Sequence, residues 1–357
     1  MHQRTSDAKQ PNALEPYGWS DHLSTRFRRL AAIGMLPGRV LRVDRGECTV
    51  ATDAGPMRCV WTPLEGGTDC EAGPPVAGDW VGIHHDPVPS VAVILPRSTA
   101  IRRTDPDPSG RRQQVLVANM DSVFIVHGLD RPEQVARMER SVVMVWESGA
   151  EPVIVLTKTD LATDHAIATT MDVMNGISPG VPVLALSNLT GDGIEDVRAH
   201  IGHGSTVALI GESGTGKSTS INRLLGSEIQ ATRDTREGDG KGRHTTVSRE
   251  LVLLPTGGAL IDTPGLRTLG LWGGSKGLSR TFSDIEHLAS DCRFRDCRHE
   301  SEPGCAVHRA VAEGSLDEGR IQNYQRMERE MAAKRLRDSR RTRSPKPHSA
   351  PSPEEWG

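Results

Sequence analysis

Two kinds of hydrophobic pattern divide the chain. Between residues 37 and 96, short runs that mix apolar and polar residues are separated by Gly and Pro, as is typical of β-strands joined by turns. Five strands are expected there, at residues 38–43, 48–50, 57–61, 79–83 and 91–95. Strands this short, with this punctuation, favour a small barrel of the oligonucleotide-binding (OB) kind.

A different pattern begins near residue 115. Continuous apolar runs alternate with segments of helical period, and such runs indicate strands buried on both faces of a parallel sheet. The runs lie at residues 123–126, 153–156, 183–186, 207–210 and 258–261, and helices are expected at 132–148 and 164–175. The sequence therefore predicts an α/β domain with a doubly wound sheet, whose ligands bind at the carboxyl ends of the strands.

The segments around these two regions are polar. We expect six parts in all: a flexible arm at 1–34 with a short helix near 24–33, the barrel at 35–100, a basic linker at 101–114, the α/β domain at 115–272, a helical domain at 273–340 and a disordered basic, Pro-rich tail at 341–357. A helix is expected from 315 to about 340, and residues 320–346 hold ten Lys or Arg against three acids. That charge fits a phosphate backbone or a solvated helix face.

Composition narrows the class of protein. The 357 residues carry a net charge of −3, and no apolar run approaches a membrane span or a signal peptide, so a cytoplasmic protein without membrane contact is expected. Residues 35–100 hold five Arg against eight acids, and they contain two aromatic residues, Trp61 and Trp80. This is a weak surface for RNA, which leaves a structural or protein-docking role open for the barrel.

A phosphate-binding loop follows the apolar run 207–210. It consists of Gly211, Glu212, Ser213, Gly214, Thr215, Gly216, Lys217 and Ser218, with Thr219 next in a helix-like segment. The strand–loop–helix context lets backbone N–H groups surround phosphates, while Lys217 reaches the β- and γ-phosphates and Ser218 ligates Mg²⁺.

Two further positions predict a guanine site. Thr157, Lys158 and Asp160 follow the strand-like run 153–156, and Ser187 follows 183–186. The carboxylate of Asp160 can accept hydrogen bonds from the N1–H and amine of guanine, whereas adenine would leave it unpaired. GTP is therefore expected rather than ATP. Asn is usual where Thr157 stands, so some base affinity or loop bracing is expected to be lost.

Candidate switch residues come last. His244, Thr245 and Thr246 end a Gly-rich stretch, and Asp262 and Gly265 belong to an Asp-Thr-Pro-Gly turn after the run 258–261. Ser218, Thr245 or Thr246, and Asp262 would hold magnesium, and Gly265 would meet the γ-phosphate. Leu266 stands where Ras-like enzymes carry a water-orienting Gln, so His244 is the candidate catalytic group beside Lys217 and Thr245. His244 as a plain switch residue or RNA contact stays open.

A Cys/His cluster lies beyond the switches. Cys292, Cys297, His299 and Cys305 have the spacing C-x4-C-x-H-x5-C in a segment poor in apolar residues. Three thiolates and one imidazole make a closed set for one structural zinc ion. His308 is an alternative fourth ligand, and unrelated reduced cysteines are the alternative to a metal site. Cys48, Cys59 and Cys70 are expected to be ordinary core or surface residues.

In an ordinary GTPase the phosphate loop precedes the guanine motif, so the order here indicates circular permutation. The chain, over residues 17–325, resembles the ribosome small-subunit-dependent GTPases, the RsgA or YjeQ family, in this motif order, in residues 242–246 and in the Cys/His cluster. The resemblance implies a barrel, a permuted GTPase domain and a zinc domain. It also implies GTP hydrolysis stimulated by the 30S ribosomal subunit, late in its maturation, by a monomer that contacts 16S rRNA.

Two other functions stay open from the sequence. One is a nucleotide-binding RNA scaffold with negligible turnover, and the other is a P-loop ATPase or kinase acting on a small substrate.

Overall fold

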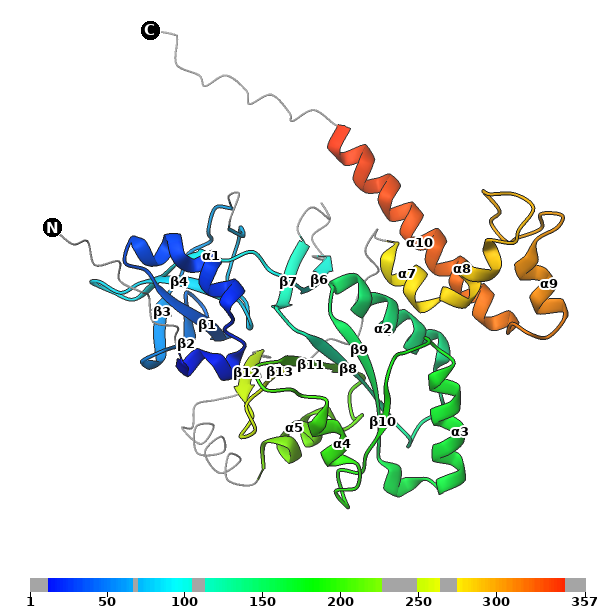
Figure 1. The fold of residues 1–357 in the computed structure, drawn as a ribbon, viewed down its shortest axis with the longest axis horizontal. Coiled ribbons are helices and arrows are strands. Elements are labelled where there is room, and N and C mark those ends of the chain that lie inside the picture. Colours follow the sequence, from blue (N-terminus) through cyan, green and yellow to red (C-terminus); the bar gives the residue numbers. More distant parts are fainter. Residues whose placement is uncertain (1–11, 67–69, 105–112, 227–248, 264–274, 344–357) are drawn as a thin grey trace, which may run out of the picture. The chain divides into compact units, whose positions relative to one another are not determined.

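The computed structural model describes residues 12–66, 70–104, 113–226, 249–263 and 275–343. The chain divides into two compact units, Met1–Gly270 and Leu271–Gly357, which are described in turn (Figure 1). The candidate switch residues His244, Thr245, Thr246 and Gly265 lie outside the described residues, as does most of the expected tail. Their roles stay predictions from the sequence.

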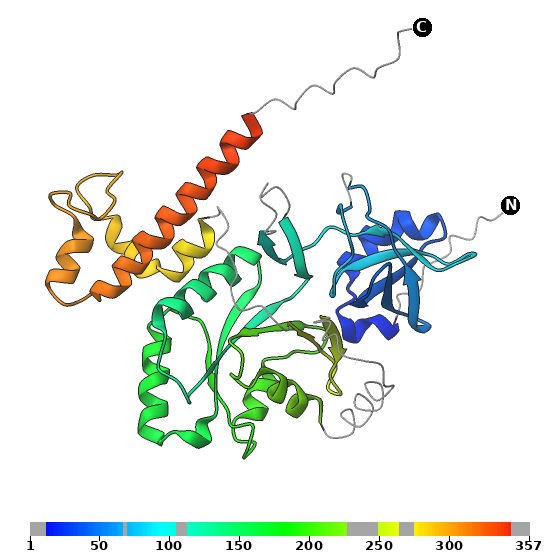
Figure 2. The ribbon, with the colours of Figure 1, turned by 180° about the vertical axis from the view of Figure 1, so that it is seen from behind.

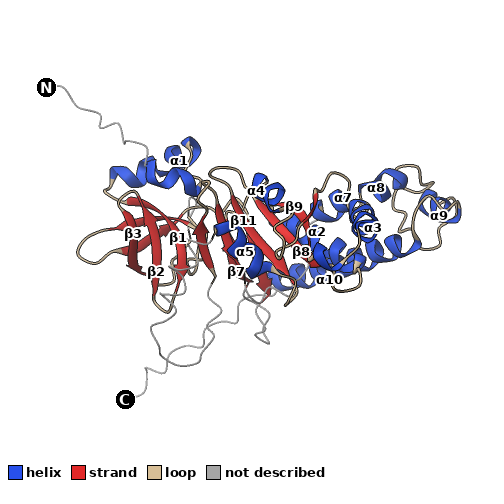
Figure 3. Cartoon of the chain, turned by 90° about the horizontal axis from the view of Figure 1, so that it is seen from below, coloured by secondary structure: helices blue, strands red, loops and turns tan. Residues whose placement is uncertain are grey.

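The first unit contains a closed five-stranded barrel. Its strands are β1 (Leu36–Val43), β2 (Glu47–Thr52), β3 (Gly55–Val60), β4 (Trp80–His84) and β5 (Ser90–Ile94). β1 pairs with β2 and β4, β2 with β3, β3 with β5, and β5 with β4, so the ring closes. Figure 3 draws the strands in red. Its core is made of Val40, Cys48, Val50, Cys59, Val81, Ile83, Val91 and Ile94. The expected OB-like barrel is confirmed, and Cys48 and Cys59 are core residues.

Residues 12–33 of the expected flexible arm form two helices on the barrel, and the second corresponds to the short helix expected near 24–33. They are the 3-10 helix η1 (Asn12–Tyr17) and α1 (Asp21–Ala32), and the Ser20 side chain caps α1 by accepting from the Leu23 N–H. Trp19 is buried edge-on against Phe27 and Trp80, at centroid distances of 5.8 and 5.1 Å. The segment is ordered because Leu23, Phe27 and Leu30, one apolar stripe of α1, belong to or pack against a buried cluster that includes Trp19 and Trp80.

A six-stranded, mostly parallel arrangement forms the α/β part. Its strands are β8 (Ser122–Gly128), β9 (Glu151–Thr157), β10 (Val183–Ala185), β11 (Thr206–Gly211), β12 (Glu250–Leu253) and β13 (Ala259–Asp262). Their order is β10-β9-β8-β11-β13-β12, and β12 runs antiparallel to β13. The helices are α2 (Val135–Ser148), η2 (Thr159–Leu161), α3 (Asp164–Asn175), α4 (Ile194–Ala199) and α5 (Lys217–Leu225).

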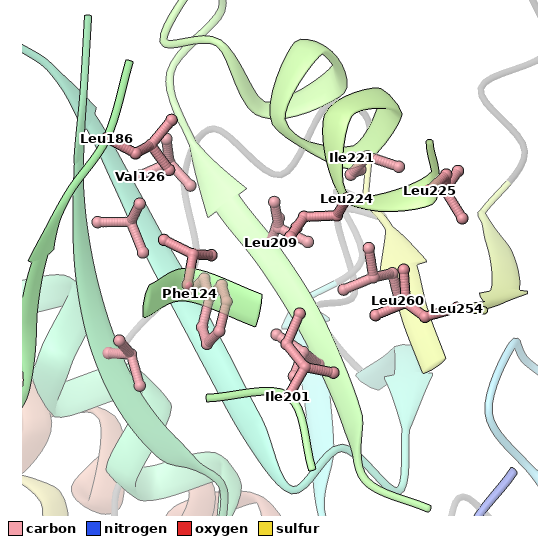
Figure 4. Packing of buried hydrophobic residues seen from close by; sticks show 14 residues of the cluster. Phe124, Val126, Leu186, Ile201, Leu209, Ile221, Leu224, Leu225, Leu254 and Leu260 are labelled. Atoms are coloured by element: carbon pink, nitrogen blue, oxygen red, sulfur yellow. The ribbon is translucent and has the colours of Figure 1, made fainter. Parts of the chain in front are cut away.

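Helices cover both faces of this sheet, which explains its continuous apolar strands. On one face, Phe124, Leu209 and Leu260 belong to one buried cluster with residues of α4 and α5 (Figure 4). On the other, Val123 and Ile125 are also buried, and α2 packs against β8 and β9. The expected doubly wound α/β fold is confirmed. All the parallel strands end at one edge, where the loops after β8, β9, β10, β11 and β13 meet.

The barrel is joined to this sheet by hydrogen bonds of buried groups. β1 pairs with β12 at Arg42 and Glu250. Arg39 of β1 is buried, stacks on Trp80, and donates to the Asn119 carbonyl (2.8 Å) and the Thr206 hydroxyl (3.1 Å). Burial lowers the pKa of Arg39 to about 10, while Asp121 and Asp79 oppose the shift. Part of the expected linker instead forms the hairpin β6 (Ala100–Thr104) and β7 (Gln113–Ala118).

The second unit is helical (Figure 2). It contains α7 (Lys276–Thr281), α8 (Ser283–Ala289), α9 (Ala306–Ala312) and the long α10 (Glu318–Arg343). Phe282 is fully buried and packs edge-on against Tyr324 of α10 at 5.5 Å. Arg320 binds Asp284 through two hydrogen bonds of 2.7 Å, which fixes α10 to α8. None of the described helices has the length and apolar character needed to cross a membrane.

Candidate functional site

The phosphate loop lies where β11 ends and α5 begins. Gly211 has φ 149°, and a Cβ there would stand 2.4 Å from the Val126 carbonyl oxygen, so only glycine fits against β8. The Lys217 Nζ donates to the carbonyls of Gly211 (2.9 Å) and Glu212 (2.5 Å), which places the ammonium inside the loop. Ser213, Gly214, Ser218 and Thr219 are exposed or half-buried, and Thr215 is buried. This arrangement suits the binding of a chain of phosphates.

Thr157 joins the guanine motif to the phosphate loop. Its side chain is fully buried, and its hydroxyl donates to the Thr215 carbonyl at 2.6 Å, with the His127 carbonyl at 3.3 Å. The sequence predicts some loss of loop bracing because Thr157 stands where Asn is usual. The bracing is nevertheless present, because the Thr157 hydroxyl at the end of β9 reaches the phosphate loop. What Thr157 lacks is a second polar atom for the base.

Asp160 and Ser187 come together at the edge of the sheet, as the sequence predicts for a guanine site. Ser187 is buried and its hydroxyl donates to the Asp160 carboxylate, while it accepts from the N–H groups of Leu189 and Thr190 at 3.1 Å each. Asp160 itself is exposed at the start of η2. One carboxylate oxygen is thus oriented by Ser187, which prepares the group for a ligand with two adjacent N–H donors.

Two residues that the sequence analysis did not select connect the loop after β10 to α5. Asn188 donates to the Ser220 hydroxyl at 3.0 Å, and Arg223 donates to the carbonyls of Asn188 (2.8 Å) and Leu189 (2.9 Å). These bonds hold the guanine-site loop against the helix that begins with Lys217. No motif spacing identifies them, since they depend on the loop after β10 lying against α5.

Charged side chains surround the phosphate loop on the β8 side. Glu212 binds Arg131 at 3.0 Å and also Arg137, and the hydrogen bond from Arg131 holds the pKa of Glu212 below its usual value. Lys158, in the left-handed conformation with φ 63°, binds Asp130 at 2.6 Å. Arg131 and Asp130 both belong to the loop after β8. That loop therefore fixes the phosphate loop and the guanine motif relative to each other.

Asp262 and Ser218 are the described candidates for magnesium. Ala208 pairs with Ile261, which brings the carboxyl end of β13, with Asp262, beside that of β11. The next residue, Thr263, is buried and its hydroxyl donates to the Leu209 carbonyl. A hydroxyl and a carboxylate at one edge suit a hard cation that also binds phosphate oxygens. Thr245, the third expected ligand, lies outside the described residues.

The second unit brings together the four predicted zinc ligands. Ligand atoms of Cys292, Cys297, His299 and Cys305 all lie within 4.8 Å of one another. The Cys292 and Cys305 sulfurs are 3.9 Å apart, and the His299 Nδ1 lies 3.6 and 3.4 Å from them. Tetrahedral zinc, about 2.3 Å from sulfur and about 2.0 Å from nitrogen, sets its ligand atoms about 3.5–3.8 Å apart. The cluster therefore fits a metal ion, and the His308 side chain is not among its ligand atoms.

The surroundings of the cluster also suit a metal. The Ala306 N–H donates to the Cys292 sulfur at 3.3 Å, and the His308 N–H donates to that of Cys305 at 3.5 Å. Desolvation opposes ionisation of Cys292, but the N–H groups of Ala306 and Val307, together with the hydrogen bonds of Cys305 and Cys297, outweigh it and lower the pKa of this thiol. His299 is buried with φ 57°, and its carbonyl accepts from Gln325 of α10. The metal would thus connect the 292–305 segment to α9 and α10.

The bond from Thr157 gives a first prediction. Thr157→Val keeps the shape of the side chain but leaves the buried Thr215 carbonyl without its donor, which costs about 1 kcal/mol. We expect the affinity for GDP, measured by titration calorimetry, to fall about fivefold. Thr157→Asn should keep wild-type affinity or exceed it, and Thr159→Val is the matched control. Unchanged affinity in the valine variant would show that the bond does not support the nucleotide site.

Comparisons with known proteins agree with this geometry. The family model described as RsgA GTPase matches residues 94–272. The small ribosomal subunit biogenesis GTPase RsgA of Streptomyces coelicolor is 44% identical over 336 residues, covering 91% of this chain and 88% of the relative. A second such protein, from Syntrophotalea carbinolica, is 40% identical and covers 90% and 91%.

Two solved structures share the fold. YjeQ from Thermotoga maritima has a TM-score of 0.60 at 24% identity and covers 84% of this chain and 99% of that one. YloQ, described as a circularly permuted GTPase, has a TM-score of 0.58 at 24% identity and covers 85% and 96%. The family model and the identity to the two relatives, which agree with the permuted order of the motifs, show that the chain belongs to the RsgA GTPase family.

Proposed function

We propose that this protein hydrolyses GTP to GDP and phosphate and acts as a nucleotide-controlled factor in late maturation of the 30S ribosomal subunit. The main support is the meeting of the phosphate loop, Thr157 and the Asp160–Ser187 pair at one edge of a permuted sheet. The name of the Streptomyces coelicolor relative supplies the cellular role that we extend to this chain.

Within this proposal, different residues bind the phosphates, hold the magnesium ion and select the base. The N–H groups of residues 211–218 and the Lys217 ammonium bind the phosphates and offset the charge that develops on them during transfer. Ser218 and Asp262, with Thr245 from the sequence, would hold Mg²⁺, which would offset the negative charge of the phosphates. Asp160 and Ser187 select guanine, and Lys158, held by Asp130, lies beside them.

Partner binding is proposed for the second unit and for α10. The segment that contains the zinc ligands is followed, after α9, by α10, a 26-residue helix with basic residues along its length. A basic helix is suited to rRNA phosphates, so we propose contact with 16S rRNA by a cytoplasmic monomer. Stimulation of turnover by the 30S particle belongs to the same proposal.

The two other functions are separated by simple measurements. A scaffold without turnover would release no phosphate from GTP, with or without 30S subunits. An ATPase or kinase would let ATP displace labelled GTP, whereas the Asp160 carboxylate should make ATP a poor competitor. The proposed function predicts slow phosphate release alone and faster release with 30S subunits.

His244 carries a separate prediction within this experiment. Leu266 is aliphatic and cannot orient water, which leaves His244 as the candidate to position the nucleophile. We expect His244→Ala to lower 30S-stimulated phosphate release by about 10²-fold, with GDP affinity unchanged. Stimulated turnover within about twofold of wild type would mean that His244 has another role.

A further inference from the structure

A cavity of about 530 Å³ lies where the barrel meets the α/β part of the first unit. Trp61, Pro74 and Pro75 line it from the barrel, and Gln114, Leu116 and Arg249 line it from the other side. Its size is in the range of sites for small ligands. It is remote in sequence from the phosphate loop, and none of the nucleotide-site residues named above lines it.

Arg249 brings a guanidinium to the lining of the cavity. Its Nε is buried and has no hydrogen-bond partner among the described residues. Burial and the neighbouring charge of Arg103 both lower the pKa of Arg249, so the guanidinium is held where it lacks a counter-charge. A guanidinium in this setting favours an anion in the cavity, because a charged group taken out of water is costly unless it is paired.

The other charges at the cavity also favour an anion. Arg45 lines it as a second guanidinium. Asp44 is the acid among the described lining residues, and its carboxylate lies 3.2 Å from Arg42 and 4.0 Å from Arg58. Arg58 also pairs with Glu47, so Arg42 is the closer partner of Asp44. Because Arg42 compensates Asp44, the charge that Arg45 and Arg249 offer to a ligand is positive.

The walls add a flat apolar surface. Trp61 is partly buried, and its Nε1 donates to the Glu47 carbonyl at 3.1 Å, which fixes the plane of the indole. Pro74 and Pro75 stand in the same lining. A fixed aromatic ring beside arginines is the combination that binds nucleic-acid bases by stacking while the phosphate pairs with the guanidinium.

We propose that this cavity binds one nucleotide of a single-stranded RNA, with its phosphate at Arg249 and Arg45 and its base against Trp61. The proposal rests on the proposed function, because it identifies a contact for the RNA-containing partner. Arg249 directly precedes β12, in which Glu250 pairs with Asp262, the candidate magnesium residue. RNA in the cavity would therefore contact the strand next to the GTPase site.

The test uses the full chain saturated with GDP and a labelled decamer of uridine that contains one 5-iodouridine. Arg249→Ala and Arg45→Ala should each weaken binding by about fivefold and reduce the salt dependence by about 0.7 in the slope of log K against log salt, as for one lost phosphate contact. Arg28→Ala removes the same charge from the exposed face of α1 and should bind as wild type. Irradiation should cross-link the decamer to Trp61.

Each other outcome overturns the proposal. Affinities of the two arginine variants equal to that of the Arg28 variant, or a cross-link that maps outside the cavity, would show that RNA does not enter it. Displacement of the decamer by micromolar uridine monophosphate would identify a free nucleotide as the ligand instead. Phosphate release from GTP by the wild-type protein is measured in parallel, so a failure of the cavity is distinguished from a failure of the proposed function.

Discussion

Asp160→Asn is expected to change the base that the nucleotide site accepts. The carboxylate offers two acceptors to the N1–H and amine of guanine. The NH2 group of a carboxamide would instead place a donor opposite one of these two guanine donors. Sites that hydrogen-bond a ligand reject mismatched analogues strongly, because buried polar groups are then left unpaired. We expect the affinity of the variant for GTP to fall at least about 10²-fold. Xanthosine triphosphate offers an acceptor at the altered position, so the variant should bind it more tightly than GTP.

The measurement is competition against a fluorescent guanine nucleotide, with phosphate release as a second readout. The Ser187 hydroxyl can still donate to the carboxamide oxygen of the substituted side chain, so the loop after β10 should keep its place. Asp164→Asn is the matched control, since this exposed carboxylate lies in the first turn of α3, four residues further on. If the Asp160 variant bound GTP as tightly as the control, the base-reading role would have to be assigned elsewhere.

This site also shows how far local sequence patterns reach. The phosphate loop and Asp160 are predictable because each follows an apolar strand, and the carboxyl ends of parallel strands meet at one edge. The bond from Thr157 to Thr215 is not, since it depends on the distance between β9 and the loop after β11. The roles of Asn188 and Arg223 are harder still to predict. Their partners are backbone carbonyls and a hydroxyl, which have no sequence signature.

The N-terminal region illustrates the same limit for the fold. The strands of the barrel were predictable from their punctuation, but the apolar stripe of α1 is short, and the sequence does not show that it packs with Trp19 and Trp80. Burial of a few large aromatic side chains can order such a segment, because each contributes a large apolar area. Similarly, Arg39 appears in the sequence as one more strand arginine, and only the structure shows it buried between the barrel and the sheet.

Loss of the metal ligands is expected to have the largest effect on the second unit. Segment 292–305 contains the four candidate ligands. A structural zinc ion contributes on the order of 10 kcal/mol in small domains, comparable to their whole stability. We expect one zinc ion per chain in the wild-type protein and almost none in Cys305→Ala. Limited proteolysis should then cut that variant within 292–305, as it should cut the wild type after strong chelation.

A matched pair of histidines makes the assignment testable residue by residue. The ring of His299 lies 3.4 Å from the Cys305 sulfur, whereas His308 meets that sulfur through its backbone N–H. His299→Ala should therefore lose zinc and expose the segment to protease, while His308→Ala and Cys70→Ser should keep both the metal and the protection. Zinc loss in the His308 variant with retention in the His299 variant would reverse the assignment, and a wild-type protein without metal would leave the three cysteines as ordinary thiols.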